Sequence, residues 1–225
     1  ADIGCAMGIT GTDVAKEAAD MIMTDDNFST IVSAVREGRG IYENIKRTIH
    51  FLISCNIGEI LTVFTAFFLH LPAPLLAIQL LWVNLVTDSL PALALGVEPI
   101  SDNIMKRKPV QPKQSVFAGG AGFSIIIEGC FIGALSLLAY TIGRVFFDFP
   151  GTEPVVGRTM AFAVLSLSQL AHTFNMRSQQ SIFKLSPFSN PKLLWAALVC
   201  ILLQISVIVI EPLSYIFKTV PLTGG

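Results

Sequence analysis

Long apolar stretches separated by short polar connections dominate this chain. They cover about 28–69, 76–95, 117–147, 157–176 and 191–210. Each is at least as long as the roughly 20 residues that a helix needs to cross the hydrocarbon core of a bilayer. We therefore predict a mainly α fold, a polytopic transmembrane helix bundle with about five spans.

The first of these stretches is longer than a single span. Its helical spacing of apolar residues continues from Ile31 to Ile49 and on into the apolar run, and no proline interrupts it. A helix over 28–69 would be roughly 60 Å long, about twice the hydrocarbon thickness. We expect its first part to lie in solvent as a stalk and its second part to cross the membrane.

Residues 1–27 have a different pattern from the rest. A short apolar run ends at Gly8, a helical pattern follows from Gly11 to Ala19 with Thr12 or Asp13 able to cap it, and a second short run covers 21–24. Strand, helix and strand in succession are typical of an α/β domain with a parallel sheet. This segment is too short to bury a core alone.

Positive charge alternates between the connections as the positive-inside rule requires. Cations gather at Arg36–Arg47, at Lys106–Lys113 and at Arg177–Lys192, whereas 70–75 and 148–156 contain no Lys or Arg. This pattern predicts that the stalk is cytoplasmic and that the end of the chain, 211–225, lies outside. We interpret the basic 106–113 connection as an orientation and lipid-headgroup feature.

Polar residues inside the second span share one helical face. Asn84, Thr87 and Asp88 are spaced i, i+3 and i+4, and Pro91 removes the helical partner of the Thr87 carbonyl. A carboxylate at bilayer depth costs at least about 2.5–3.5 kcal/mol, and a bound cation would compensate it. Carboxylate, amide, hydroxyl and carbonyl oxygens are the ligands that hard cations such as calcium prefer.

The first span supplies a second polar set. Asn56 and Glu59 lie on one face, and Gly58 between them permits the close approach of another backbone. Because a short connection joins the two spans, we expect their polar faces to meet. Gln169 in the fourth span could add an oxygen or only hydrogen-bond between helices, and the sequence leaves both open.

Other candidate residues point to structural roles. Glu128 lies near the middle of the third span without an evident partner, so packing and proton movement both remain open. The four cysteines are far apart and the three histidines lack ligand-like spacing, which favours buried or interfacial roles. With 52% hydrophobic and 14% charged residues and a net charge of −1, the chain gives no case for nucleic acid.

Four motifs together resemble those of the P-type cation-transporting ATPases, nearest to the calcium pumps of sarco/endoplasmic reticulum type and their bacterial relatives. They are Ala1–Gly8, Asp25–Val32, Asn56-Ile-Gly-Glu59 and Asn84-Leu-Val-Thr-Asp-Ser-Leu-Pro91. The resemblance implies that 1–27 is the end of a haloacid dehalogenase-like phosphorylation domain and that 28–225 is transmembrane domain, resembling helices five to nine of ten.

The resemblance also implies a function. Such pumps export Ca²⁺ from the cytoplasm using ATP and Mg²⁺, which the N-terminal part of the pump binds. Six positions match ion ligands of the family or stand in their place: Asn56, Glu59, Asn84, Thr87, Asp88 and Gln169. Residues 106–109 resemble the loop that contacts the phosphorylation domain. A bacterial plasma membrane is the expected location, with an endoplasmic reticulum-type membrane as the alternative.

The sequence also departs from the family pattern. The Asp-Lys-Thr-Gly-Thr and Thr-Gly-Asp-Gly-Val-Asn-Asp motifs are not in this segment, so we expect it to be inactive without the rest of the pump. Gln169 stands where two-site pumps carry a glutamate, which would leave a single-ion pump. The alternatives are a P-type pump for Mn²⁺, Na⁺/K⁺ or H⁺, or an ATP-independent transporter or channel, which would not need residues 1–32.

Overall fold

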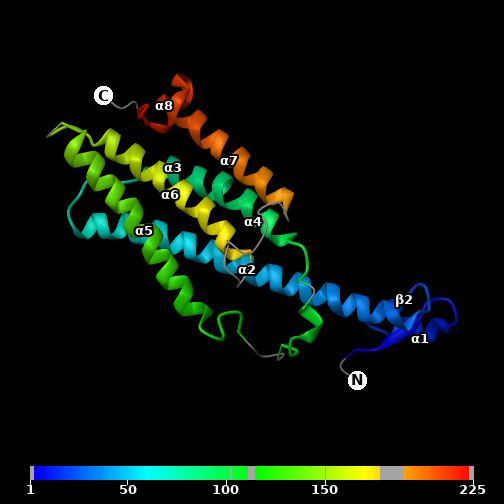
Figure 1. Cartoon of the computed structure of the whole chain (residues 1–225). Helices are drawn as coiled ribbons and strands as arrows, with labels where there is room; N and C mark the ends of the chain where they lie inside the picture. Colours follow the sequence, from blue (N-terminus) through cyan, green and yellow to red (C-terminus); the bar gives the residue numbers. More distant parts are fainter. Residues whose placement is uncertain (1–2, 102, 111–114, 150, 178–189, 223–225) are drawn as a thin grey trace. The chain divides into compact units, whose positions relative to one another are not determined.

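A computed structural model gives the fold. It describes residues 3–101, 103–110, 115–149, 151–177 and 190–222. The chain is mainly helical (Figure 1). It divides into two compact units. One unit comprises Ala1–Glu43 with Ile100–Val110, and the other comprises Asn44–Pro99 with Gln111–Gly225. The cations Lys113 and Lys184, which entered the topology prediction, lie outside the described residues.

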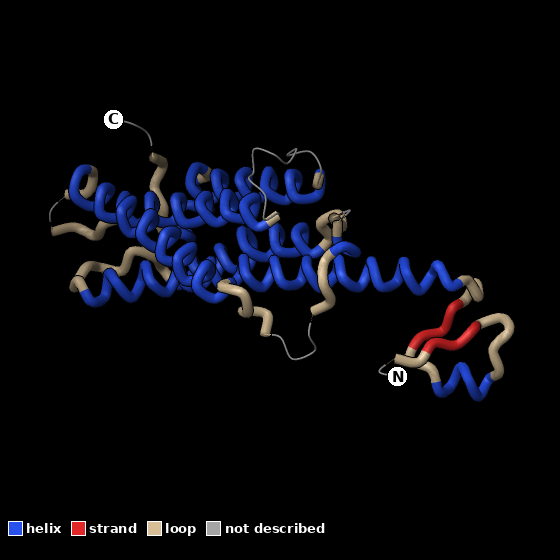
Figure 2. The backbone as a smooth tube through the Cα atoms, turned by 60° about the horizontal axis from the view of Figure 1, so that its bottom comes forward, coloured by secondary structure: helices blue, strands red, loops and turns tan. Residues whose placement is uncertain are grey.

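The first unit begins with the predicted strand, helix and strand. Strands β1 (Cys5–Met7) and β2 (Met21–Met23) pair in parallel, and α1 (Asp13–Ala18) connects them (Figure 2). Thr12 caps α1, since its hydroxyl accepts a hydrogen bond from the Ala15 amide at 3.3 Å. The α/β segment expected at the start of the chain is thus confirmed.

Asp26 follows β2 and links back by hydrogen bonds to the residues after β1. Its carboxylate accepts hydrogen bonds from the amides of Ile9 and Thr10 at 2.9 and 2.7 Å, and from the Thr10 hydroxyl at 2.7 Å. These bonds hold the pKa of the Asp26 carboxyl below its usual value, the Ile9 amide having the largest effect. Asp26 adopts a left-handed φ of 49°, a conformation that aspartate tolerates better than most residues.

Helix α2 runs from Phe28 to Phe68, where the sequence predicted a helix over 28–69. Within the first unit it contacts the segment 100–110, which contains the short 3₁₀ turn η2 (Ile104–Lys106). Arg107 forms an ion pair with Glu43 at 2.7 Å, and Arg39 donates to the Arg107 carbonyl at 3.1 Å. The basic connection is therefore attached to the cation-bearing part of α2.

The second unit is a helix bundle. Its elements after α2 are α3 (Ala77–Trp82), η1 (Val83–Asp88), α4 (Ser89–Gly96), α5 (Ala121–Phe146), α6 (Val155–Met176), α7 (Pro191–Val209) and α8 (Glu211–Phe217). The third span begins at Ala121 instead of 117, the other span ends lie within two residues of the predicted limits, and α8 was not predicted. The chain is a multi-pass membrane protein.

Among the described residues, four helical segments are long and apolar enough to cross a membrane: Phe28–Phe68, Ala77–Gly96, Ala121–Phe146 and Pro191–Val209. Helix α6, the predicted fourth span, has 22 residues but does not meet that test of length and composition. It carries several polar residues because it packs among other helices, contacting α5, α4, η1 and α7. Its Phe162 and Leu165 are fully buried in the core.

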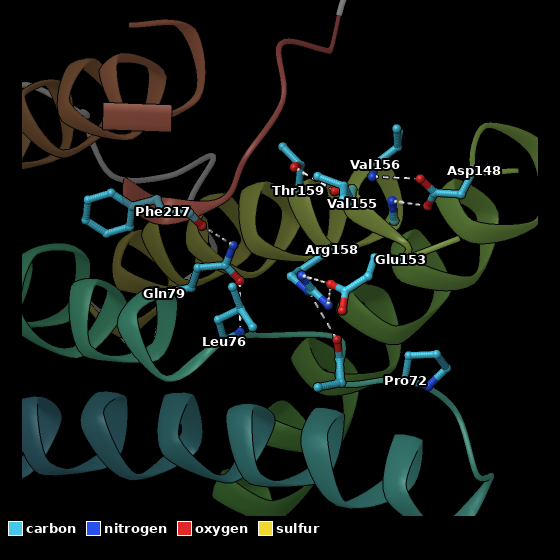
Figure 3. Close-up of polar contacts among 12 residues, drawn as sticks. Pro72, Leu76, Gln79, Asp148, Glu153, Val155, Val156, Arg158, Thr159 and Phe217 are labelled. Atoms are coloured by element: carbon cyan, nitrogen blue, oxygen red, sulfur yellow. Dashed lines mark hydrogen bonds and ion pairs between the residues drawn. The ribbon is translucent and has the colours of Figure 1, made fainter. Parts of the chain in front are cut away.

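Polar contacts fix the start of α6 and its neighbours (Figure 3). The Asp148 carboxylate accepts hydrogen bonds from the amides of Val156 and Gly157 at 2.9 and 2.8 Å, which satisfies the open end of the helix. Arg158 pairs with Glu153 at 3.3 Å and donates to the Ala73 carbonyl at 3.3 Å. The acidic 148–156 connection therefore has a capping role.

Helix α8 packs back onto the bundle. The Gln79 amide donates to the Phe217 carbonyl at 3.0 Å, as Figure 3 shows. The Phe217 ring meets Trp82 edge to face, with centroids 5.1 Å apart, and stacks on Phe162 at 6.5 Å. These aromatic contacts bury Phe217 and tie the end of the chain to α3 and α6.

Helices α2 and α5 approach closely at small residues. A Cβ atom placed on Gly133 would lie 2.9 Å from the Gly58 carbonyl oxygen, and one on Gly129 would lie 2.9 Å from the Ser54 carbonyl oxygen. Such distances are too short for a real side chain, so glycine is required here. The close backbone approach that the sequence predicted for Gly58 is present, and its partner is α5.

A buried ion pair joins α4 to the end of α6. Arg177 donates to Glu98 Oε1 from Nε at 3.1 Å and from Nη2 at 3.0 Å, and both residues are buried. Asn190, which caps α7, donates to Glu98 Oε2. Asn44 of α2 donates to the Glu98 carbonyl at 2.8 Å. Glu98 thus connects four helices at one end of the bundle, α2 through its main-chain carbonyl and the others through its carboxylate.

Candidate ion-binding site

A π-helical turn interrupts the second span. The sequence predicted one helix over 76–95, but η1 (Val83–Asp88) separates α3 from α4. The Ser89 hydroxyl donates to the Asn84 carbonyl at 2.8 Å, and the Thr87 hydroxyl donates to the Val83 carbonyl at 2.9 Å. Side-chain donors therefore satisfy carbonyls where the α-helical ladder is broken. Single π turns inside helices occur frequently at functional sites.

Glu59 is the centre of a buried polar group that three helical segments form. Its Oε2 accepts a hydrogen bond from the Asn84 amide of η1 at 2.8 Å. Its Oε1 accepts one from the Gln169 amide of α6 at 3.0 Å. The polar faces of the first two spans meet, as the sequence predicted, and Gln169 joins them.

Asp88 is buried with a relative exposure of 1%, yet neither carboxylate oxygen has a hydrogen-bond partner among the described residues. The Gln169 Oε1 and the Ser166 Oγ are likewise buried without a partner in this part of the chain. A buried polar oxygen without a partner is costly, and a charged one more so. These oxygens are of the kinds that bind a hard cation.

Two predicted site residues form hydrogen bonds within their own helical segments instead of with Glu59. Thr87 is fully buried, but its hydroxyl bonds to its own helix. Asn56 is exposed and donates its amide to the Leu52 carbonyl of α2 at 2.7 Å. The structure therefore joins Glu59, Asn84 and Gln169 directly, and it does not join Asn56 or Thr87 to them by a hydrogen bond.

Ser166 was not singled out from the sequence. It lies one turn before Gln169 on α6, a spacing that places both on one face. That spacing is the signal that could have identified it. Its hydroxyl is a neutral oxygen ligand of the type found in calcium sites.

The ligand chemistry is that of oxygen rather than of nitrogen and sulfur. In the described ranges, no group of three or more His, Cys, Asp or Glu residues could hold a metal ion. The candidate site has two carboxylates, and its remaining oxygens are amides and hydroxyls. This composition suits a hard cation that takes many oxygen ligands better than zinc or another soft metal.

Comparison with known proteins agrees with this chemistry. The sequence profile of the family described as "Cation transporting ATPase, C-terminus" matches residues 72–225. Calcium-transporting ATPase 1 of Bacillus cereus is 50% identical, covering 99% of this chain and 26% of that protein. A calcium-transporting ATPase of Bacillus subtilis is 50% identical over 100% of this chain. The chain spans about a quarter of the length of these relatives.

Proposed function

Because this chain belongs to the P-type cation-transporting ATPases, we propose that it is the ion-binding membrane part of a pump that exports Ca²⁺ from the cytoplasm. The two calcium-transporting relatives support calcium as the cation. A bacterial plasma membrane is the proposed location. The lipid bilayer and the rest of the pump are its proposed partners.

One observation carries this proposal. Two carboxylates, Glu59 and Asp88, are buried on adjacent spans, and the two oxygens of Asp88 have no hydrogen-bond partner among the described residues. Buried carboxylates in a membrane protein require compensation, and a divalent cation between them would supply it. We assign the ligands to Glu59, Asn84, Thr87, Asp88 and Gln169, with Asn56 on the adjacent face of α2.

The amides at the site must change their orientation when a cation binds. Asn84 and Gln169 present N–H groups to Glu59. An amide has an oxygen at the other side of the same group, so a half-turn offers that oxygen to the cation. Gln169 contributes no charge, and the site with two carboxylates is proposed to bind one ion per cycle.

ATP and Mg²⁺ are proposed to act in the remaining part of the pump. The segment contains neither the phosphorylation motif nor the magnesium motif of the family. We therefore propose that the segment alone hydrolyses no ATP. Helix α2 is proposed to connect the phosphorylation domain to the ion site.

Binding of radioactive calcium to the complete pump tests the proposal. At about micromolar free calcium, the range of sensor-type sites, we expect one ion per pump and its loss in Asp88→Asn. The mutant should remain folded, because the substitution keeps the side-chain shape and removes a buried charge. Glu211→Gln, an exposed carboxylate of α8, is the matched control and should bind normally.

Other outcomes lead to other conclusions. Binding of two ions would mean that Gln169 does not limit the site to one. Calcium-dependent phosphorylation retained in Asp88→Asn would refute the ligand assignment. A protein that binds no calcium but is phosphorylated in response to Mn²⁺, Na⁺ or H⁺ would belong to another branch of the family.

A further inference from the structure

A second polar cluster lies within the bundle, formed by His50 of α2, Glu128 of α5 and His172 of α6. The Nε2 of His50 is 2.6 Å from Oε2 of Glu128, and the Nε2 of His172 is 3.6 Å from the same oxygen. Two imidazoles from different helices therefore converge on one carboxylate oxygen. The sequence left Glu128 without a partner, and the structure gives it two.

The hydrogen bonds around His172 define its role. Its Nε2 lies 2.9 Å from the Ser54 hydroxyl, and that hydroxyl lies 2.9 and 2.8 Å from the carbonyls of His50 and Phe51. A hydroxyl has one proton. When one of these carbonyls accepts it, Nε2 of His172 carries a proton and donates to Ser54. This leaves the second ring nitrogen to gain or lose a proton.

The cluster brings one carboxylate and two imidazoles together inside the bundle. The titratable groups that face His172 are Glu128 from α5 and His50 from α2, and on α2 the cations Lys46 and Arg47 precede His50 by about one turn. With two neutral imidazoles the cluster has one negative charge, which is costly in a membrane span. A proton from solvent, bound at an imidazole nitrogen, makes the cluster neutral. The Glu128 side chain is 29% exposed, so its carboxylate reaches the surface of the bundle.

The cluster shares two helices with the candidate ion site. Ser54 and His50 precede Glu59 on α2, and His172 follows Gln169 on α6 by three residues. Helices α2 and α6 are therefore joined at two levels, by Gln169 to Glu59 and by His172 to Ser54. A change in the first contact when the cation binds would alter the second.

We propose that His50, Glu128 and His172 form a proton-binding site, separate from the ion site and linked to it through α2 and α6. The link, though not the proton site itself, rests on the proposed calcium function. A proton bound here removes negative charge near the ion site and so weakens cation binding. By reciprocity, calcium binding promotes release of this proton.

The first experiment measures how calcium affinity depends on pH in the complete pump. We compare the wild type with Glu128→Gln, which keeps the shape and a hydrogen-bonding oxygen, and with His70→Gln as the control. His70 is an exposed histidine after α2 and outside the cluster. We take the ratio of the calcium affinity at about pH 8 to that at about pH 6, a window around the ordinary pKa of histidine. Because Glu128→Gln removes the linkage between the proton and the cation, this ratio should be smaller in that variant than in the wild type by about twofold or more. His70→Gln should match the wild type.

The second experiment observes the cluster directly by nitrogen-resolved imidazole spectra of the complete protein. The wild type should show a strongly deshielded Nε2 proton from the short His50–Glu128 hydrogen bond, and Glu128→Gln should lack it. A spectrum and a pH dependence that are both unchanged in Glu128→Gln would overturn the proposal. An altered spectrum with an unchanged pH dependence would refute the link. Absence of calcium binding in the wild type would instead refute the proposed function, while the spectra would still test the proton site.

Discussion

Gln169 of α6 donates a hydrogen bond from its amide nitrogen to Oε1 of Glu59 of α2, at 3.0 Å. A glutamate at position 169 could not donate this bond when ionised, and it would place a second negative charge beside the first. The choice of glutamine or glutamate at position 169 therefore changes the negative charge of the site before a cation binds.

Replacing Gln169 by glutamate should strengthen cation binding. The substitution adds a charged oxygen ligand next to Glu59, so we expect more calcium ions bound per pump or a higher apparent affinity. Equilibrium binding of radioactive calcium to the complete pump measures both quantities. Gln169→Met, which lacks the amide oxygen, should have the opposite effect. If neither substitution alters calcium binding, residue 169 is not a ligand.

Breaking the Glu98–Arg177 ion pair should strongly destabilise the bundle. Arg177→Ala leaves the buried Glu98 carboxylate without its guanidinium, and loss of one partner of a buried pair costs about 3–5 kcal/mol. The midpoint of thermal unfolding in detergent should therefore fall clearly below that of the wild type. Lys192→Ala removes an exposed cation from α7 and is the control, with an expected change within about 0.5 kcal/mol. Equal midpoints for the two variants would contradict this account.

Gly133→Ala should force α2 and α5 apart. The new methyl group would lie 2.9 Å from the Gly58 carbonyl oxygen, a backbone atom that cannot move aside easily. Overpacking of this kind costs about 1–3 kcal/mol. Gly38→Ala is a useful contrast, because nothing lies within 4 Å of that position, and the same change in a helix should stabilise by about 0.5–1 kcal/mol. Opposite shifts of the unfolding midpoint in the two variants are the expected result.

The Asp26 turn should weaken at acid pH. Its hydrogen bonds lower the pKa of the Asp26 carboxyl in the folded protein, so the charged form contributes stability above the ordinary aspartate pKa of about 3.9. That contribution is lost as the pH falls through the lower, folded value. Hydrogen exchange at the amides of Ile9 and Thr10, corrected for intrinsic rates, should show protection at pH 7 and less of it near pH 3.

A substitution separates this effect from general acid unfolding. Asp26→Asn tolerates the left-handed backbone but lacks the charge, so its Ile9 and Thr10 amides should be less protected already at pH 7. Protection in that variant should change little with acid. Equal protection of the two proteins at pH 7 would show that the charge is not what holds the turn.

Much of the fold could be predicted because helices that face lipid must be apolar over a defined length. This constraint identified the stretch that became α2 and the spans around α5 and α7. It described α6 less well, since a helix surrounded by other helices can carry Arg158, Gln169 and His172. The short helix α8 is held by contacts of Phe217 with distant residues, and local sequence does not indicate such contacts.

The candidate site, like the fold, could be predicted from the sequence only in part. Intramembrane carboxylates and amides are unusual enough to make Glu59, Asn84 and Asp88 candidate ligands from the sequence alone. The partners of Glu128 could not be predicted, because His50 and His172 are 78 and 44 positions away in the chain and only the packing of three helices brings them together. The role of Ser166 likewise depends on which face of α6 meets η1.

The π turn at Val83–Asp88 has a practical consequence for mutational scanning of the second span. A π turn accommodates one residue more than an α-helical turn, so α4 is out of phase with α3 by roughly 100° about the helix axis. A single helical wheel drawn through 77–96 therefore assigns the wrong face to one half of the span. Substitutions before Val83 and after Asp88 should be interpreted on two separate wheels. Deleting one residue between them would remove the extra residue of the π turn, so that a single wheel would describe the whole span.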